Sequence, residues 1–317
     1  MADQPEYLTP PSALGAFIRR NPVALKELRG RMRGARAFVV LSVYAVLMSL
    51  FTLILYGTYS ASQAVTLSTS GGVIGKLIFG AVVAIELFLV CFISPAFTSG
   101  AISGERERQT FDLLRTTLLP AERIVSGKLI SALAYVLLLL LVAVPLQSLA
   151  FLMGGVTIEE VLLSIWILIV SATGYASVGV FFSASTQRTL NASVLTYAFA
   201  LAVTVALPIG TAILAAVGAA AGASDQVGLE ALMIYGTYLL AATNPIATAV
   251  LTEVNILNNG GIFVLTQSLS NGTNVPLVQP WIPYTLFMAF VTVVMVRLSV
   301  RAIRRASLEG DTQPDAE

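Results

Sequence analysis

One acidic residue in this sequence stands inside an apolar stretch, where it could do chemistry within a membrane. Glu86 lies near the middle of the apolar run 77–100. A charged side chain at the centre of a bilayer is costly unless it is paired or neutralised. Two interpretations stay open, because no basic residue occupies another apolar run. Glu86 faces a translocation path or proton relay, or a protonated Glu86 forms a hydrogen bond to a neighbouring helix.

The composition removes most other catalytic and metal-binding chemistry. The sequence has no His and a single Cys, Cys91, so His-based acid–base catalysis and His/Cys metal sites are excluded. A phosphate-binding loop needs Gly, four residues and then Gly-Lys-Ser/Thr. Gly75-Lys76 and Gly127-Lys128 both lack the Ser or Thr and the upstream Gly. We therefore expect no catalytic, cofactor or metal site, and we do not expect an enzyme.

The balance of apolar and charged residues predicts a membrane protein. Of 317 residues, 56% are hydrophobic and 11% are charged, and the mean hydropathy is +0.85. A soluble domain carries about 25% charged residues. A chain so poor in charge cannot cover its surface with polar groups, so lipid is the expected solvent. The net charge of +1 argues against a nucleic-acid partner.

Six stretches are long and apolar enough to cross a bilayer, which requires about 20 residues. Residues 1–37 contain no apolar run, so the first span is expected to insert without a cleavable signal peptide. Pro208 is expected to kink the fifth span. The predicted spans are 38–57, 77–100, 129–153, 161–182, 190–220 and 281–300.

The basic residues predict the orientation of these spans, since Lys and Arg concentrate on the cytoplasmic side. With six spans, 17 of the 18 basic residues fall on one side, and Lys76 alone falls on the other. A seventh apolar stretch, 231–251, is interrupted by Asn244-Pro245. If it crossed the membrane, the four C-terminal arginines would lie outside. We therefore predict that it is a re-entrant or surface-lying pair of helices.

The sequence thus predicts an all-α membrane protein with six transmembrane helices and both termini in the cytoplasm. Residues 1–37 form a cytoplasmic and interfacial segment with an amphipathic helix over 11–36, unless its basic residues only set topology. Residues 38–300 form the transmembrane domain, with an external segment at 221–280. Residues 301–317 form a cytoplasmic tail. The expected location is the cell (inner or plasma) membrane, as a multi-pass protein.

The cytoplasmic loop 103–128 is far longer than a turn requires. Thr110 could cap a helix, and Phe111, Leu114 and Leu118 then form an apolar stripe flanked by Leu113. Pro120 ends this helix. Such a short amphipathic helix is suited to a groove on a soluble partner. The alternative is that it packs back against the protein itself.

These residues bear a resemblance to the membrane permeases of ABC-2-type ATP-binding-cassette transporters. In that family an acidic stretch after the second span leads to a Thr-x-x-Leu-Leu helix and then to a Gly-Lys entering the third span. The matching residues here are Glu105, Glu107, Thr110, Leu113, Leu114, Thr117, Gly127 and Lys128. Asn21-Pro22, Lys26-Glu27, Arg29 and Asn244-Pro245 are also similar. The family commonly has Gly where Gln109 stands, and Pro where Leu118 stands.

The resemblance implies a coupling helix within 105–120 that docks on a separate cytoplasmic ABC ATPase. The docking residues would be Glu105, Glu107, Thr110, Phe111, Leu113, Leu114 and Leu118. It also implies a dimer of two permease copies or homologues around one path, with ATP bound by the partner subunit. The layout favours export. The alternative function is a non-transporting membrane subunit that anchors or stabilises another membrane complex.

Overall fold

The computed structural model describes residues 26–27, 30, 35–63, 71–111, 119–152, 154–220, 227–259, 261–268, 272 and 274–311. Within these residues, six helices are long and apolar enough to cross a membrane. They confirm the prediction of an all-α chain with six such helices. The six spans comprise α3 (Ala35–Gln63), α4 (Gly71–Thr98), α7 (Ala121–Leu152), α8 (Ile158–Ser185), the continuous pair α9 (Thr189–Leu201) and α10 (Leu207–Ala220), and α13 (Trp281–Asp311).

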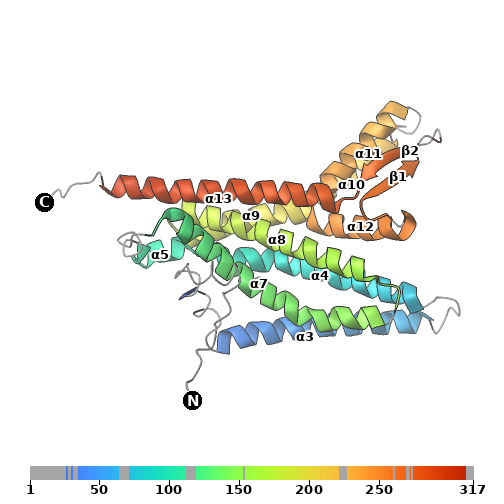
Figure 1. Cartoon of the computed structure of the whole chain (residues 1–317), viewed down its shortest axis with the longest axis horizontal. Helices are drawn as coiled ribbons and strands as arrows, with labels where there is room; N and C mark the ends of the chain where they lie inside the picture. The colour runs from blue at the N-terminus through green and yellow to red at the C-terminus, as the bar shows by residue number, and fades with distance from the viewer. Residues whose placement is uncertain are drawn as a thin grey trace, which may run out of the picture.

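The long helices lie side by side in one elongated bundle, with α3 at one edge and α13 at the other (Figure 1). Short helix α5 (Ser103–Glu107), the start of α3 and the end of α13 lie at one end, which we call the α5 end. The opposite end carries α11 (Val227–Ala241), α12 (Pro245–Asn259) and the strands β1 (Val264–Ser268) and β2 (Asn274–Val278). We call it the hairpin end.

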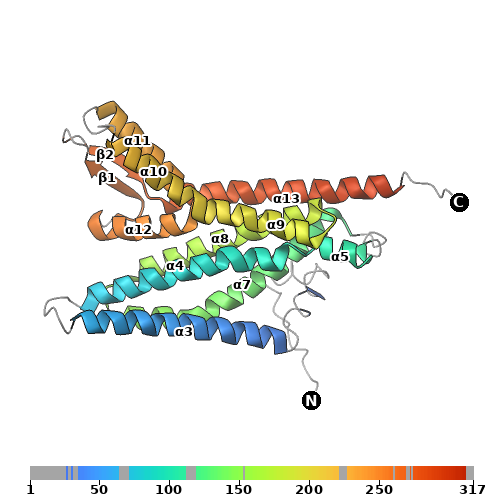
Figure 2. The same ribbon diagram turned by 180° about the vertical axis from the view of Figure 1, so that it is seen from behind.

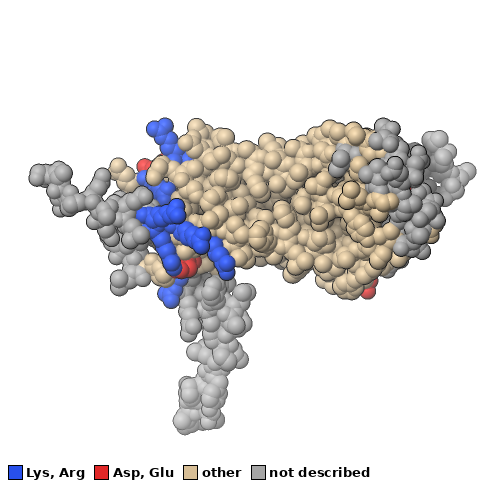
Figure 3. Space-filling model, turned by 90° about the horizontal axis from the view of Figure 1, so that it is seen from above, with Lys and Arg blue, Asp and Glu red and all other residues tan. Residues whose placement is uncertain are grey.

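Charge is distributed unequally between the two ends. Lys and Arg gather at the α5 end, and the middle of the bundle presents other residue types (Figure 3). Large apolar side chains are exposed along the bundle, such as Phe38, which is 73% exposed, Leu141 and Leu286. A soluble protein would bury many of these side chains, whereas a bilayer solvates them. The surface is therefore that of a bundle with an apolar belt and one basic end.

Helix α8 is the central element, because it contacts α4, α7, α9 and α13. Small residues allow this close packing. A Cβ added at Gly174 would approach the Met288 sulfur on α13 to 2.7 Å, and one at Gly179 would overlap with the Thr98 side chain on α4. α8 begins at a capping box, in which the Thr157 hydroxyl accepts from Glu160 N and the Glu160 carboxylate accepts from Thr157 N.

The fifth span bends where the sequence predicts a kink. A π-helical turn, Ala202–Ala206, joins α9 to α10 just before Pro208. Pro208 has no N–H, so the carbonyl of Thr204, four residues earlier, loses its helical donor. α10 consequently leaves the direction of α9 and leans towards the hairpin end (Figure 2).

The stretch predicted as a re-entrant or surface-lying pair is divided between two helices, α11 and α12, that meet near Asn244. Asn244 is an N-cap, since its Oδ1 accepts from Ala247 N at 2.8 Å, and Pro245 occupies the first helical position. The Asn244 amide also donates to the carbonyls of Val203 and Thr204, at 2.7 and 3.0 Å. The Asn244 side chain therefore caps α12 and supplies hydrogen-bond donors to two carbonyls of the π-helical turn.

The antiparallel pair β1–β2 within 221–280 was not predicted from the sequence. Val264 pairs with Val278 and Ser268 with Asn274. The hairpin joins α12 to α13, and Trp281 at the start of α13 donates its indole N–H to the Ile262 carbonyl at 2.8 Å. Its strands are five residues each, too short for alternation to stand out beside the long apolar helices.

Candidate partner-docking site and intramembrane carboxylate

The loop that follows α4 is fixed to the bundle by one buried serine of α8. Ser183 Oγ accepts from the backbone N–H groups of Ile102 and Ser103, at 2.8 and 3.0 Å. Ser103 and Ser183 are both fully buried. The chain therefore leaves α4 through a rigid turn, and α5 begins against α8 rather than in a free loop.

A buried cation ties α5 to the start of α7. Lys128 is 1% exposed, and its ammonium group donates to Glu105 Oε1 at 2.8 Å and to Glu27 Oε1 at 3.1 Å. A buried ammonium is tolerated only when it is paired and hydrogen-bonded. Three residues from separate parts of the sequence thus meet, and each belongs to the set that carries the family resemblance.

The remaining charged residues of α5 hold the junction between α8 and α9. The two carboxylate oxygens of Glu107 accept from the Thr189 N–H at 2.8 Å and the Thr189 hydroxyl at 2.7 Å. Thr189 is the first residue of α9, so Glu107 caps that helix from outside. Arg106 donates to the Thr186 carbonyl at 3.0 Å. α5 is therefore bonded to α7, α8 and α9 at once.

Phe111 is packed into the protein. It is 7% exposed and belongs to a cluster with Ile102, Val125 and Ile303. The Arg106 guanidinium lies 5.0 Å from the centre of its ring. For this residue the structure favours packing against the chain itself, the alternative that the sequence left open, and its contact with a partner stays a prediction.

Among the described residues of the loop before Phe111, the exposed ones form a four-residue run, Glu107 to Thr110. Gln109 has a φ of 55°, a left-handed conformation that favours glycine. The Thr110 N–H and hydroxyl both donate to the Glu105 carbonyl, at 2.9 and 3.2 Å. The other predicted docking residues, Leu113, Leu114 and Leu118, lie outside the described residues, as does most of the predicted amphipathic helix 11–36.

Glu86 lies inside the bundle between α4 and α7. It is fully buried, and its Oε2 accepts from Gln147 Nε2 at 2.6 Å. Its Oε1 is buried without a hydrogen-bond partner in the described structure. Gln147 is the partner that sequence reasoning missed, because a search for a basic residue passes over a neutral amide. Glu86 thus has a hydrogen bond to a neighbouring helix, as accepting partner, while its protonation and its place on a translocation path both stay predictions.

The part of the chain that the structure describes holds no group of three or more Cys, Asp or Glu side chains that could bind a metal ion. No protein-family model matches the chain, and no curated protein matches it. The arrangement at the α5 end is therefore interpreted from its own geometry. That geometry is a short exposed turn preceded by a helix, α5, that is hydrogen-bonded to α7, α8 and α9.

Proposed function

We propose that this chain is the permease subunit of an ABC-2-type ATP-binding-cassette transporter. The observation that carries the proposal is the contact of the buried Lys128 with both Glu105 and Glu27. The family resemblance rests on these residues, and nothing in their sequence positions requires them to meet. Their contact joins two parts of the family pattern: the acidic stretch after the second span and the Gly-Lys that enters the third span.

In this proposal the α5 end is cytoplasmic and both termini lie there. Its support is the concentration of basic residues at that end (Figure 3), which follows the positive-inside rule. The hairpin end then faces outwards, from a multi-pass protein in the cell (inner or plasma) membrane. A cytoplasmic ATPase could contact the turn 107–110 and the loop that follows it.

The ATPase would supply ATP binding and hydrolysis, and a second permease copy or homologue would complete the translocation path. Closure of the two ATPase subunits would displace the loop that contains α5. Since α5 is bonded to α7, α8 and α9, these helices would move with it as rigid bodies. The proposed direction of transport is export.

The test is co-purification of the full-length chain with the ATPase encoded beside it. Leu114→Asp changes the predicted apolar stripe, and Arg108→Glu changes the exposed turn. Each should lower the recovered ATPase by at least about tenfold, the loss that follows removal of one interface anchor. Phe111→Asp is unsuitable, because Phe111 is buried and a charge there would disturb folding.

Arg301→Glu is the matched control, since Arg301 is exposed on α13 at the same basic end and undergoes the same change of charge. It should leave the ATPase yield unchanged. Normal recovery of the ATPase with both loop variants would overturn the docking site. A stable membrane assembly without an ATPase and without ATP-dependent flux would favour the anchoring subunit instead.

A further inference from the structure

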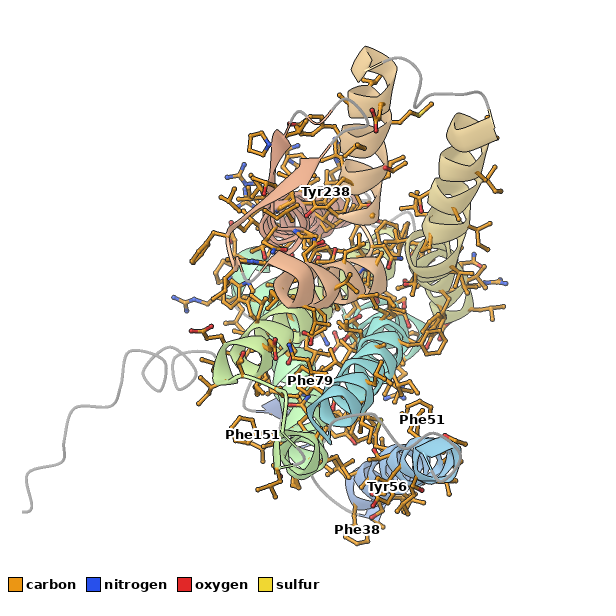
Figure 4. All side chains as sticks on the ribbon, turned by 90° about the vertical axis from the view of Figure 1, so that its right-hand side faces the viewer. Phe38, Phe51, Tyr56, Phe79, Phe151 and Tyr238 are labelled. Carbon is orange, nitrogen blue, oxygen red and sulfur yellow. The ribbon has the colours of Figure 1, made fainter. Side chains whose placement is uncertain are left out.

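A cavity of about 580 Å³ lies at the hairpin end between α4, α8 and α12. Its volume falls in the range of small-molecule sites, roughly 300–1,000 Å³. Its walls are mainly apolar, with contributions from Phe79, Val83 and Ile167. Figure 4 looks onto this end and labels Phe79, which lies beneath α12 in that view. α12 contacts both α4 and α8, so it forms the third wall.

The cavity opens onto an apolar part of the protein surface. Leu77, Val250, Val254 and Leu257 contribute to its lining and are also among the exposed large apolar residues. An acyl chain can therefore reach the cavity across an apolar rim without crossing a polar barrier, and it would exchange one apolar surrounding for another.

The polar end of the cavity carries one cation and two acids. Lys76 and Glu160 form an ion pair of 2.8 Å, and the second oxygen of Glu160 accepts from Thr157 N. Both carboxylate oxygens of Glu160 therefore already have hydrogen-bond partners within the protein. Glu253 also lines the cavity, and its Oε1 is buried without a hydrogen-bond partner in the described structure. With both acids ionised, one positive and two negative charges leave a net charge of −1.

A second polar group is equally unpaired. Thr252 is 2% exposed, lines the same cavity, and has a buried hydroxyl without a partner among the described residues. Buried polar groups are paired in the great majority of cases, so these two groups are available to hydrogen-bond a ligand that enters the cavity. An anionic head would meet two carboxylates against one ammonium, and a cationic head would neutralise the excess negative charge.

We propose that this cavity binds a single-chain amphiphile with an ammonium head, whose chain lies along Phe79 and Val83 and whose head donates to Glu253. Thr252 supplies a further hydrogen bond at the head. The inference does not rest on the proposed transport function, because the site lies at the opposite end from α5 and its occupancy needs no ATPase.

Photolabelling of the full-length protein in phosphatidylcholine nanodiscs tests the site. The probe is dodecylamine with a diazirine on its chain, and dodecanoate with the same group is the charge-reversed control. Unlabelled dodecylamine should compete, and mass spectrometry should place the label on α4 or α12. Glu253→Gln should weaken binding by about tenfold, as expected for loss of one charge-assisted hydrogen bond.

Gly80 offers a variant that fills the cavity. It lines the cavity, and a Cβ added there meets no heavy atom within 4 Å. Gly80→Leu should reduce labelling at least about tenfold, while Gly210→Leu, equally open but on α10, should leave it unchanged. Should Gly80→Leu fail to insert, Gly80→Ala and Glu253→Gln carry the test.

Three results would overturn the proposal. The first is unchanged labelling in both Gly80→Leu and Glu253→Gln. The second is equal labelling by the dodecanoate probe, which would remove the role of charge. The third is a cross-link between α12 residues of two copies that dodecylamine does not reduce, which would show that a second copy covers the cavity.

Discussion

Glu86 and Glu253 are two carboxylates in different surroundings. Glu86 is enclosed by the bundle, and its carboxylate accepts a hydrogen bond from the Gln147 amide. Glu253 lies on α12, outside the six spans, in a cavity that it shares with Lys76 and Glu160. The first has a neutral partner on a neighbouring span, and the second has only long-range charges. Their responses to substitution and to pH should therefore differ.

Glu86→Gln should preserve the fold, because the new amide oxygen can still accept from Gln147. It removes the ionisable group, so we expect transport-coupled ATPase activity of the assembled complex to fall. Glu86→Leu should instead lower the thermal midpoint, since it leaves the Gln147 amide buried without a partner, a cost of about 1–3 kcal/mol. Full coupled activity in Glu86→Gln would remove Glu86 from the mechanism.

The stability of the hairpin end should depend on pH through Glu253. Burial and the nearby Glu160 carboxylate raise its pKa from 4.5 to about 7, although Lys76 opposes the shift. The folded state then binds more protons than the unfolded state between these values, so stability should fall as pH rises from about 4.5 to 7. Thermal midpoints across this range should show a flatter profile for Glu253→Gln. An identical slope in both proteins would contradict this assignment.

At the scale of elements, α5 illustrates how a short helix is held by contacts from elsewhere. Its five residues are too few to be stable alone. Lys128, Ser183 and Thr189 supply bonds from three different helices. The turn that ends it passes through Gln109 with a positive φ, at the position where the ABC-2 permeases commonly have Gly.

Gln109→Gly should stabilise this turn. A non-glycine residue in the left-handed region costs about 1–2 kcal/mol, and the greater freedom of glycine in the unfolded chain offsets about 0.4–1 kcal/mol. We therefore expect a small rise in thermal midpoint, measured on the detergent-solubilised protein. Gln109→Ala is the control and should give no rise, because alanine retains a Cβ. A fall in Gln109→Gly would show that the Gln109 side chain makes a stabilising contact.

The sequence predicted the long helices well, because each reports itself through some 20 consecutive apolar residues. The Asn244-Pro245 break and the Pro208 kink were equally legible, since both depend on local backbone chemistry. The contact between these two features could not be predicted, because the Asn244 amide donates to carbonyls about 40 positions away in the sequence. Lys76 illustrates the same limit, because its ion-pair partner Glu160 is 84 positions away in the sequence.

For the whole molecule, the proposed six-span topology puts the α5 end and the hairpin end on opposite sides of the membrane. We expect a Cys at Arg108 and a Cys at Thr266, each in a Cys91→Ala background, to react with an impermeant maleimide from opposite sides. Both positions are exposed, so access reports topology rather than burial. Tags on the two termini should be protected together in sealed cells. Labelling of both cysteines from one side would contradict the six-span topology.

The fifth span is hydrogen-bonded to other parts of the chain at two points. Its first residue is bound by Glu107, and its π-helical turn is bound by Asn244. These points are about 21 Å apart at 1.5 Å per residue, with helix and no loop between them. We expect a displacement of α5 along this axis to move the π-helical turn and, through Asn244, the start of α12. In the proposed topology, a hydrogen-bonded helix thus connects α5 on one side of the membrane to α12, one wall of the cavity, on the other.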